Sequence, residues 1–485
     1  MATIPLLKLP SARSLVDLIC RSMSSSLADN LRDLDGWKSS GLALSTSSNE
    51  CARLLDGTIR QVIAMREFPE LGGIAKTIGD LKASDPEAAL TNAFMLVMTA
   101  MQKSPLFDLD FETEVKRCED LSANGSIYNA REKLHLKAAS QFARGCLPEA
   151  ESTWEGILKE YPNDLLALKL HHDTCFHSGN ERGKRDVVER VLPHWSKSDP
   201  CTSYLHGMLA FGLEECGEYE KAEEHAKNAL SQQPTDSWAT HALAHVYEMQ
   251  GRTKDSKDFL VNSSEHWKKG LFTSHISWHH SLSFVDDGDF EGALAIYDDD
   301  IIRHLKAAPN PLSVADASSL LWRLEMAGVD VGDRWKSMPD LTPLLNHHLT
   351  SFNDAHITMA LKRGDHPETS KQFKQSLAKF ISSGTNSNSR MVAETIGIPL
   401  FGALEAYVDG DYEKTVSKMK PLCQELHKIG GSNAQDDVFI LTLVSACYRS
   451  GSEENKILAR QVLQERSAKK VNSGLMARIL TEYKQ

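Results

Sequence analysis

A glycine-centred hexapeptide recurs along this chain and restricts the folds that the chain can adopt. The clearest copies are GCLPEA (145–150), GEYEKA (217–222), GDFEGA (288–293) and GDYEKT (410–415), with degenerate copies between and after them. The lead glycines lie 34 to 46 residues apart and are Gly145, Gly179, Gly217, Gly251, Gly288, Gly328, Gly364, Gly410 and Gly451. A period of this size is typical of a repeat protein.

Each copy has the chemistry of a turn between two helices. Glycine adopts the left-handed conformation that ends a helix, and the alanine five residues later lets the next helix pack closely. Pro162 and Pro234 each follow such an alanine by 12 residues, where a proline ends the second helix. Apolar residues recur with a period near 3.6, and no alternating strand pattern is found.

Leu243, Ala244 and Tyr247 fit the first helix of the tetratricopeptide pattern, and Ala150 with Trp154 fits its second helix. The chain therefore resembles the tetratricopeptide repeats. We predict an all-α fold, a right-handed superhelical solenoid of tetratricopeptide-like helix-turn-helix repeats.

More specific runs lie at 42–50, 162–179, 234–252, 352–360 and 429–439, for example PTDSWATHALAHVYEMQGR and IGGSNAQDDVF. With these runs the chain resembles the tetratricopeptide repeat protein 38 family, from about residue 30 to 466. The resemblance implies an intracellular repeat protein and no established reaction, cofactor or catalytic residue.

The repeat spacing divides the chain into five expected parts. They are a flexible leader (1–29), an N-terminal helical region (30–130), a tetratricopeptide repeat array (131–307), divergent helical repeats (308–466) and a C-terminal helical tail (467–485). The leader carries Lys8, Arg13 and Arg21 against one acid, Asp17, and is rich in serine. We expect a cytoplasmic protein, with mitochondrial targeting through the leader as the alternative.

Composition excludes several classes of function. The 66 acidic and 54 basic residues give a formal charge of −12, which argues against nucleic-acid binding because that function needs a basic face. No run of 18 apolar residues predicts a membrane span. The nine cysteines form no CxxC pair and indicate reduced thiols rather than a disulfide framework or a zinc ribbon.

Counting 14 residues back from the lead glycines places first helices at 203, 237, 274, 314 and 350. In tetratricopeptide repeats these helices line a concave groove. The side chains that this register turns into the groove include Tyr204, Phe211, Glu214, His241, His245, Glu248, His275, His279, Trp322 and Asp354.

Two HxxxH pairs, His241/His245 and His275/His279, fall on adjacent first helices of this groove. Residues four apart share a helix face, so each pair has the spacing to chelate a metal. Ala242 and Ile276 replace the glutamate of the zinc-protease motif, so no general base is built in. We expect a polar groove in which the imidazoles hydrogen-bond to one another or to Glu248, with no metal or other cofactor; a metal is the alternative.

No phosphate-binding loop, nucleophile elbow or dinucleotide fingerprint occurs in the sequence. Gly430-Gly431-Ser432-Asn433 favours a helix C-cap followed by an N-cap over an anion-binding nest. We therefore predict a non-enzymatic interaction scaffold that holds a peptide or protein partner in the groove. The alternative is an enzyme or a metal- or small-ligand-binding protein that uses the His/Glu cluster. The oligomeric state is not indicated.

Overall fold

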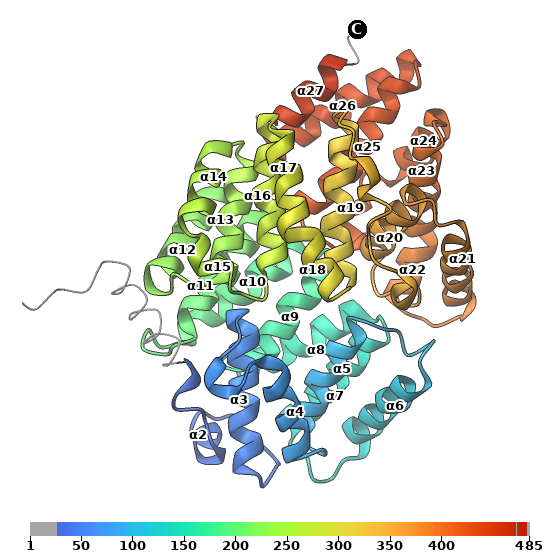
Figure 1. Ribbon diagram of the computed structural model, residues 1–485. Helices are drawn as coiled ribbons and strands as arrows, with labels where there is room; N and C mark the ends of the chain where they lie inside the picture. Colours follow the sequence, from blue (N-terminus) through green and yellow to red (C-terminus); the bar gives the residue numbers. More distant parts are fainter. Residues whose placement is uncertain (1–26, 472, 483–485) are drawn as a thin grey trace, which may run out of the picture.

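The computed structural model describes residues 27–471 and 473–482, and this part of the chain contains helices and connecting turns but no strand. The all-α solenoid is therefore confirmed there, while most of the predicted leader lies outside the described residues. The helices follow one another in space from α2 to α27 (Figure 1).

The helices are α2 (Leu34–Ser39), α3 (Asn49–Ala64), α4 (Ile74–Ser84), α5 (Ala89–Ala100), α6 (Leu109–Asn124), α7 (Ala130–Ala143), α8 (Leu147–Glu160), α9 (Leu165–Ser178), α10 (Glu181–Val191), α11 (Thr202–Glu215), α12 (Tyr219–Gln232), α13 (Ser237–Met249), α14 (Thr253–Asn262), α15 (Ser264–Trp267), α16 (Thr273–Asp287), α17 (Phe290–Ile296), α18 (Ile302–Ala307), α19 (Pro311–Met326), α20 (Ser351–Arg363), α21 (Pro367–Ser382), α22 (Asn388–Val392), α23 (Ile398–Val408), α24 (Tyr412–Met419), α25 (Asn433–Arg449), α26 (Glu453–Lys469) and α27 (Gly474–Glu482). Short 3₁₀ segments are η1 (Pro69–Leu71), η2 (Leu192–His194), η4 (Gly332–Arg334), η5 (Thr342–Leu344), η7 (Lys420–Leu422) and η8 (Leu426–Ile429). The π-helical turns η3 (Tyr297–Ile301) and η6 (Ala393–Gly397) connect α17 to α18 and α22 to α23.

The glycine turns separate the helices of successive hairpins. Eight of the nine lead glycines have a positive φ, from 65° at Gly251 to 81° at Gly288. Gly364 is the exception, because its φ is −73° and the next residue, Asp365, takes the left-handed position with φ 58°. An aspartate tolerates this region better than most residues, so the turn is retained one position later.

The caps predicted between residues 430 and 433 are present. Gly430 and Gly431 have φ of 92° and 102°. Ser432 then caps α25 in a capping box with Gln435, which supports the cap interpretation over the anion nest.

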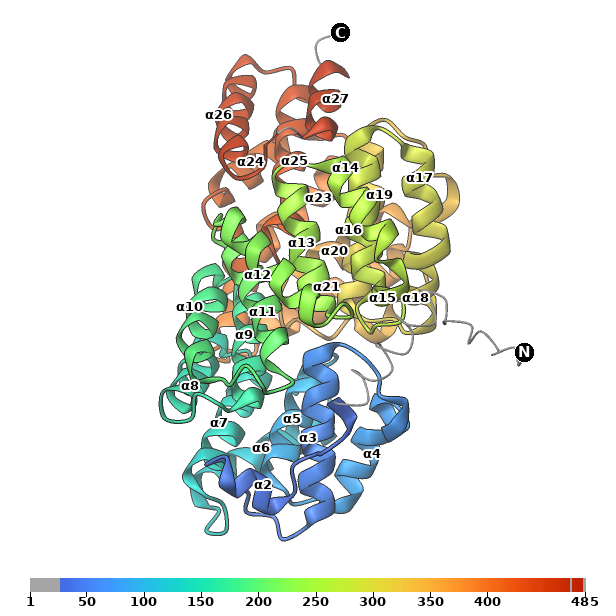
Figure 2. The same ribbon diagram turned by 90° about the vertical axis from the view of Figure 1, so that its left-hand side faces the viewer.

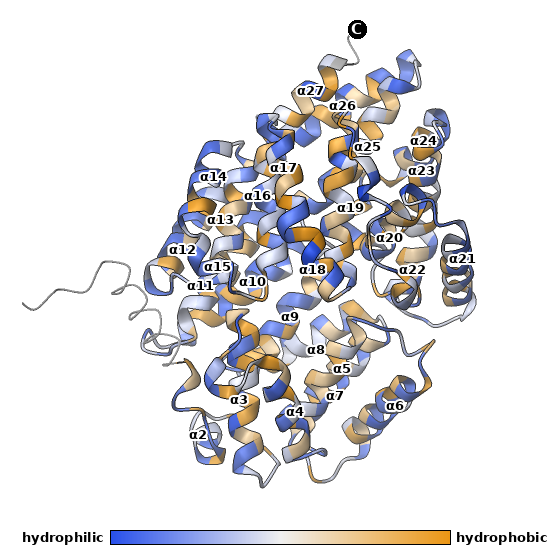
Figure 3. Cartoon of the chain, in the orientation of Figure 1, coloured by the Kyte–Doolittle hydropathy of each residue, from blue (hydrophilic) through white to orange (hydrophobic). Residues whose placement is uncertain are grey.

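Two large apolar clusters form the core, and they meet at α13. One contains buried side chains from Leu27 to Tyr247 together with Leu349, and the other extends from Met249 to Ile479. The second cluster crosses the predicted boundaries at 307/308 and 466/467, so these divisions do not separate cores. Second helices such as α12 and α14 carry much of the hydrophilic surface (Figure 3).

The concave side of the repeats is filled by the chain itself. Helix α25 contacts α13, α19 and α23 (Figures 1 and 2). On α19, Trp322 Nε1 donates to Thr442 Oγ1 at 2.9 Å and Arg323 Nη2 donates to the Ala434 carbonyl at 2.8 Å. The middle of the solenoid is therefore a packed interior.

Within the described residues, the continuous helix Asn388–Val408 is long and apolar enough to cross a membrane, with a hydropathy of 1.3 and half of its most apolar stretch buried. Core helices of globular proteins share these properties. The absence of a membrane span stays a prediction.

The turn geometry predicts a graded response to three glycine-to-alanine substitutions. Gly156→Ala, at an exposed position inside α8, is expected to stabilise by about 0.5–1 kcal/mol. Gly217→Ala meets open space but must keep φ 77°, which costs about 1–2 kcal/mol. Gly179→Ala also places Cβ 1.7 Å from the His427 carbonyl oxygen, so it should cost more than Gly217→Ala. Denaturant unfolding measures all three, and equal effects at 179 and 217 would contradict the packing of this turn.

Candidate metal centre

Helices α13 and α16 each carry one HxxxH pair, and the pairs occupy equivalent repeat positions. His241 and His275 are 34 residues apart in the sequence, as are His245 and His279. Asp236 caps α13 by accepting from the amides of Trp238 and Ala239, which fixes the start of that helix. The two helices pack directly against each other, so the two pairs face one another.

The four imidazoles converge on one point. His241 Nε2 lies 2.9 Å from His245 Nε2 and 3.1 Å from His275 Nε2. One nitrogen from each of the four rings, His279 included, lies within 4.8 Å of the others. Neighbouring first helices thus assemble a four-nitrogen cluster.

Three of the rings have a carboxylate behind their other nitrogen. His275 Nδ1 lies 2.8 Å from Asp316 Oδ1, His279 Nδ1 lies 3.0 Å from Glu248 Oε2, and His245 Nδ1 lies 3.2 Å from Glu214 Oε2. The carboxylates come from α19, α13 and α11, so four successive first helices contribute to the centre. Histidines that bind metals are usually oriented in this way by a carboxylate.

This arrangement leaves lone pairs without partners. A carboxylate hydrogen-bonded at Nδ1 favours the tautomer with hydrogen on Nδ1, so Nε2 of His275 and His279 becomes an acceptor. The single Nε2 hydrogen available on His241 satisfies only one of them. Nε2 of His279 and Nδ1 of both His241 and His245 have no hydrogen-bond partner in the structure. A cation at the centre would satisfy the converging Nε2 atoms together.

Burial keeps the imidazoles of His241, His245 and His279 neutral, as metal ligation requires. Desolvation lowers the pKa of His245 to about 4 and holds those of His241 and His279 well below the usual value. Burial also raises the pKa of Glu214 to about 8, and neither of its carboxylate oxygens has a well-aligned hydrogen bond. A divalent cation beside His245 would compensate this isolated carboxylate.

The donor set fits a tetrahedral transition-metal ion. Zinc–imidazole bonds of ~2.0–2.1 Å imply nitrogen–nitrogen separations of about 3.3 Å. The two shortest nitrogen–nitrogen separations, 2.9 and 3.1 Å, lie slightly below this value, and no separation between the four nitrogens exceeds 4.8 Å. Four protein nitrogens fill the tetrahedral coordination, which is typical of structural rather than catalytic zinc sites.

Nine of the ten residues predicted to line a groove are buried instead, and the tenth, His275, is partly buried. The nine are at most 4% exposed, namely Tyr204, Phe211, Glu214, His241, His245, Glu248, His279, Trp322 and Asp354. The His275 side chain is 13% exposed. The prediction of an accessible groove at these residues is wrong for the described conformation, because α25 and the residues after α26 occupy the concave side.

Asp354 belongs to a different polar group, which the sequence did not single out. Its Oδ2 lies 2.9 Å from His348 Nδ1, and His348 Nε2 lies 2.8 Å from Ser376 Oγ. The series of contacts from Asp354 through His348 to Ser376 has the residue types of a hydrolase triad. The Ser376 hydroxyl, however, donates to Asn346 Oδ1 at 2.6 Å, away from the histidine, so the histidine does not activate it as a base.

Comparison with known proteins adds little to this geometry. No known protein-family profile matches the chain. One solved structure, the Chs5-Chs6 exomer cargo adaptor complex bound to a portion of Chs3, has a chain that matches with a TM-score of 0.30 and 10% identity. The match covers 85% of this chain and 78% of that one. Similarity at this level identifies neither a shared function nor a shared partner.

The isolated carboxylate predicts opposite effects of one substitution on stability and on metal binding. Glu214→Gln should raise the free energy of unfolding of the metal-free protein at pH 7 by on the order of 1 kcal/mol, because Glu214, with its pKa raised to about 8, must take up a proton on folding and glutamine need not. The same change should lower Zn²⁺ affinity by ~10–100-fold, because His245 loses its supporting carboxylate. Urea unfolding and chelator competition measure the two quantities. A shift of both in the same direction would contradict this role of Glu214.

Proposed function

We propose that this helical-repeat protein binds a divalent first-row transition-metal ion, with Zn²⁺ the best fit, at His241, His245, His275 and His279. The observation that carries the proposal is the convergence of the four ring nitrogens, with carboxylates behind three of the rings. Imidazole ligands suit zinc, copper, nickel and iron. The all-nitrogen tetrahedral set favours zinc among them.

The proposed role of the metal is structural. A bound ion would join α13 to α16 through two ligands from each helix and would stabilise the repeat interface. Because protein ligands fill the coordination, we also propose that the chain is not a metal-dependent enzyme.

Membership of the tetratricopeptide repeat protein 38 family is part of the proposal and is supported by the widely spaced sequence runs, such as residues 234–252, which include one histidine pair. The eight described cysteines are free thiols, which supports a reducing compartment such as the cytoplasm.

Metal analysis of the purified full chain tests the proposal. After Zn²⁺ loading and gel filtration, we expect one metal equivalent per chain by elemental mass spectrometry. Substitution with Co²⁺ should give the intense visible absorption of a tetrahedral site. His279→Ala should lower affinity by more than ~100-fold, since losing a ligand costs more than losing a supporting carboxylate. His280→Ala, at the neighbouring residue outside the cluster, should keep full metal content. Sub-stoichiometric metal in the wild-type chain after loading would refute the function.

An interaction scaffold is our second proposal, because helical repeats present extended surfaces. Because the groove is filled, support for a scaffold comes instead from a depression of about 460 Å³ that is lined by Tyr407, Tyr412 and Arg449 among others. Aromatic and arginine side chains are frequent anchors of protein partners.

Tyr412→Ala should reduce recovery of a specific partner in a pull-down at least several-fold. Ile127→Ala, at a residue 70% exposed outside this depression, should leave recovery unchanged. Equal recovery with both variants would exclude this surface.

A further inference from the structure

The two helices that carry the histidines are also joined at their C-terminal ends by residues 470–471 and 473–482, which together we call the C-terminal clasp. On α13, Lys470 Nζ lies 2.8 Å from Glu248 Oε1, and the Val471 amide donates to the Met249 carbonyl at 3.0 Å. The clasp thus holds the last turn of α13 through one ion pair and one backbone hydrogen bond.

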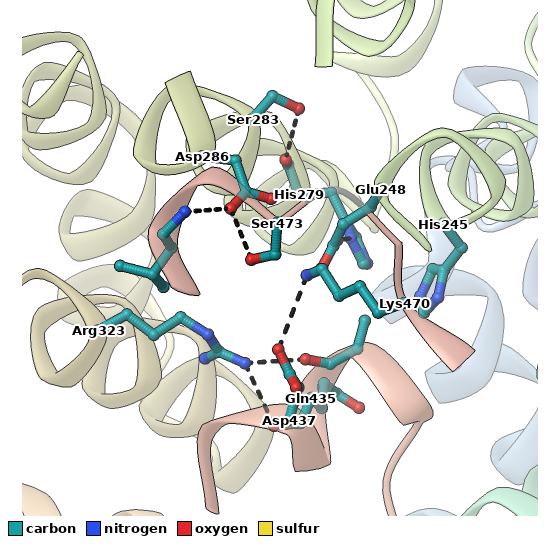
Figure 4. A network of polar contacts seen from close by, with 12 residues as sticks. His245, Glu248, His279, Ser283, Asp286, Arg323, Gln435, Asp437, Lys470 and Ser473 are labelled. Atoms are coloured by element: carbon teal, nitrogen blue, oxygen red, sulfur yellow. Dashed lines mark hydrogen bonds and ion pairs between the residues drawn. The ribbon is translucent and has the colours of Figure 1, made fainter. Parts of the chain in front are cut away.

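On α16 the clasp makes a second set of contacts. Asp286 Oδ1 accepts from Ser473 Oγ at 3.1 Å and from the Leu475 amide at 2.9 Å. Arg478 donates to the carbonyls of Val285 and Asp286, where a cation offsets the dipole at the end of the helix. Leu475, Met476 and Ile479 are buried at 4%, 6% and 0% exposure. Figure 4 shows Lys470 and Ser473 beside Glu248 and Asp286.

Glu248 connects the clasp to the centre directly. Its Oε2 faces His279 Nδ1 at 3.0 Å, while its Oε1 faces Lys470 Nζ. Lys470 and Glu248 have side chains 7% and 3% exposed, so separating them would leave charges poorly solvated. A metal on His279 Nε2 fixes the ring hydrogen on Nδ1, where it bonds to Glu248. The metal and Glu248 thus favour the same tautomer of His279, and Glu248 is held between that ring and Lys470.

The metal and the clasp therefore favour the same arrangement of α13 and α16. Two ligands that stabilise one conformation raise each other's affinity by an equal factor. We propose that the four-histidine centre and the C-terminal clasp are thermodynamically coupled, so that metal loss releases the clasp and loss of the clasp weakens metal binding. This proposal rests on the metal-binding function. Release would uncover the carboxylates of Glu248 and Asp286 at the ends of the two helices.

Hydrogen–deuterium exchange on the full chain tests the first direction. Removing Zn²⁺ with a chelator should raise exchange in peptides covering 473–482 at least several-fold, and re-adding Zn²⁺ should restore protection. Peptides from α8, which lies in the other core cluster, should not change. Equal protection of the clasp with and without Zn²⁺, in a protein shown to bind the ion, would overturn the coupling and leave the metal function intact.

Zn²⁺ affinity measured by competition with a chromophoric chelator tests the reverse direction. Lys470→Met should weaken binding by roughly 5- to 100-fold, the usual range of coupling between sites. Lys469→Met is the matched control, because that side chain is 62% exposed and contacts Glu181 rather than Glu248. It should bind Zn²⁺ like the wild type.

A third variant separates coupling from general destabilisation. Ile63→Val removes a buried methylene in the other core cluster and should lower Tm with little effect on Zn²⁺ affinity. Equal affinity of Lys470→Met and Lys469→Met would refute the coupling, as would a matching affinity loss in Ile63→Val. Failure of the wild-type chain to bind Zn²⁺ would refute the metal function and the coupling together.

Discussion

The packing of α25 into the concave side of the repeats is the constraint on which the rest of the structure depends. It excludes water from a surface that open repeat proteins present to partners. This exclusion of water has a cost at Arg323, a buried cation that donates mainly to the carbonyls of Ser319 and Ala434. Burial lowers the pKa of Arg323. Once the interior is dry, each polar group there needs a partner of its own.

Most polar groups of the interior have such a partner. Lys184 pairs with Glu215 at 2.5 Å, and Arg466 binds Asp437 through two nitrogens at 2.6 and 2.8 Å. Exceptions occur at several places, for example at His172, His347 and Asp436, and one group of them lies at Glu214 and the facing histidine nitrogens. Buried unsatisfied groups are rare in folded proteins. At the histidine cluster, unlike the other places, four nitrogens also converge on one point, and this convergence is the physical reason for assigning a cation there.

Much of the fold could be predicted from the sequence, because the turns are local. A glycine needs only its own φ to end a helix, and the register of the first helices follows from counting back along the chain. The same register brought His241, His245, His275 and His279 together. The interior location could not be predicted, because it depends on α25 and the clasp, about 200 residues further along the chain.

Two of the three supporting carboxylates could be predicted from the sequence, and the third could not. Glu214 and Glu248 fall on groove positions of the register, whereas Asp316 lies on α19, where the repeat length has drifted from 34 residues. The turn at Gly364 shows a similar limit: the pattern marks the turn, but the neighbouring Asp365 adopts the left-handed conformation. The local pattern marks where the helix ends, but it does not fix which of two neighbouring residues adopts the left-handed conformation.

The equal 34-residue separation of the two histidine pairs has a consequence for how this chain tolerates change. Each HxxxH pair supplies half of the ligand set, and the other half lies on the first helix of the neighbouring repeat, one step along the superhelix. An insertion or deletion in the 250–272 connection that altered the rise or rotation of that step would leave both pairs intact but move them out of reach of each other. The four ligands therefore meet only when the rise and rotation between the two repeats are correct, so the centre depends on the geometry between the repeats more than on the sequence of either one.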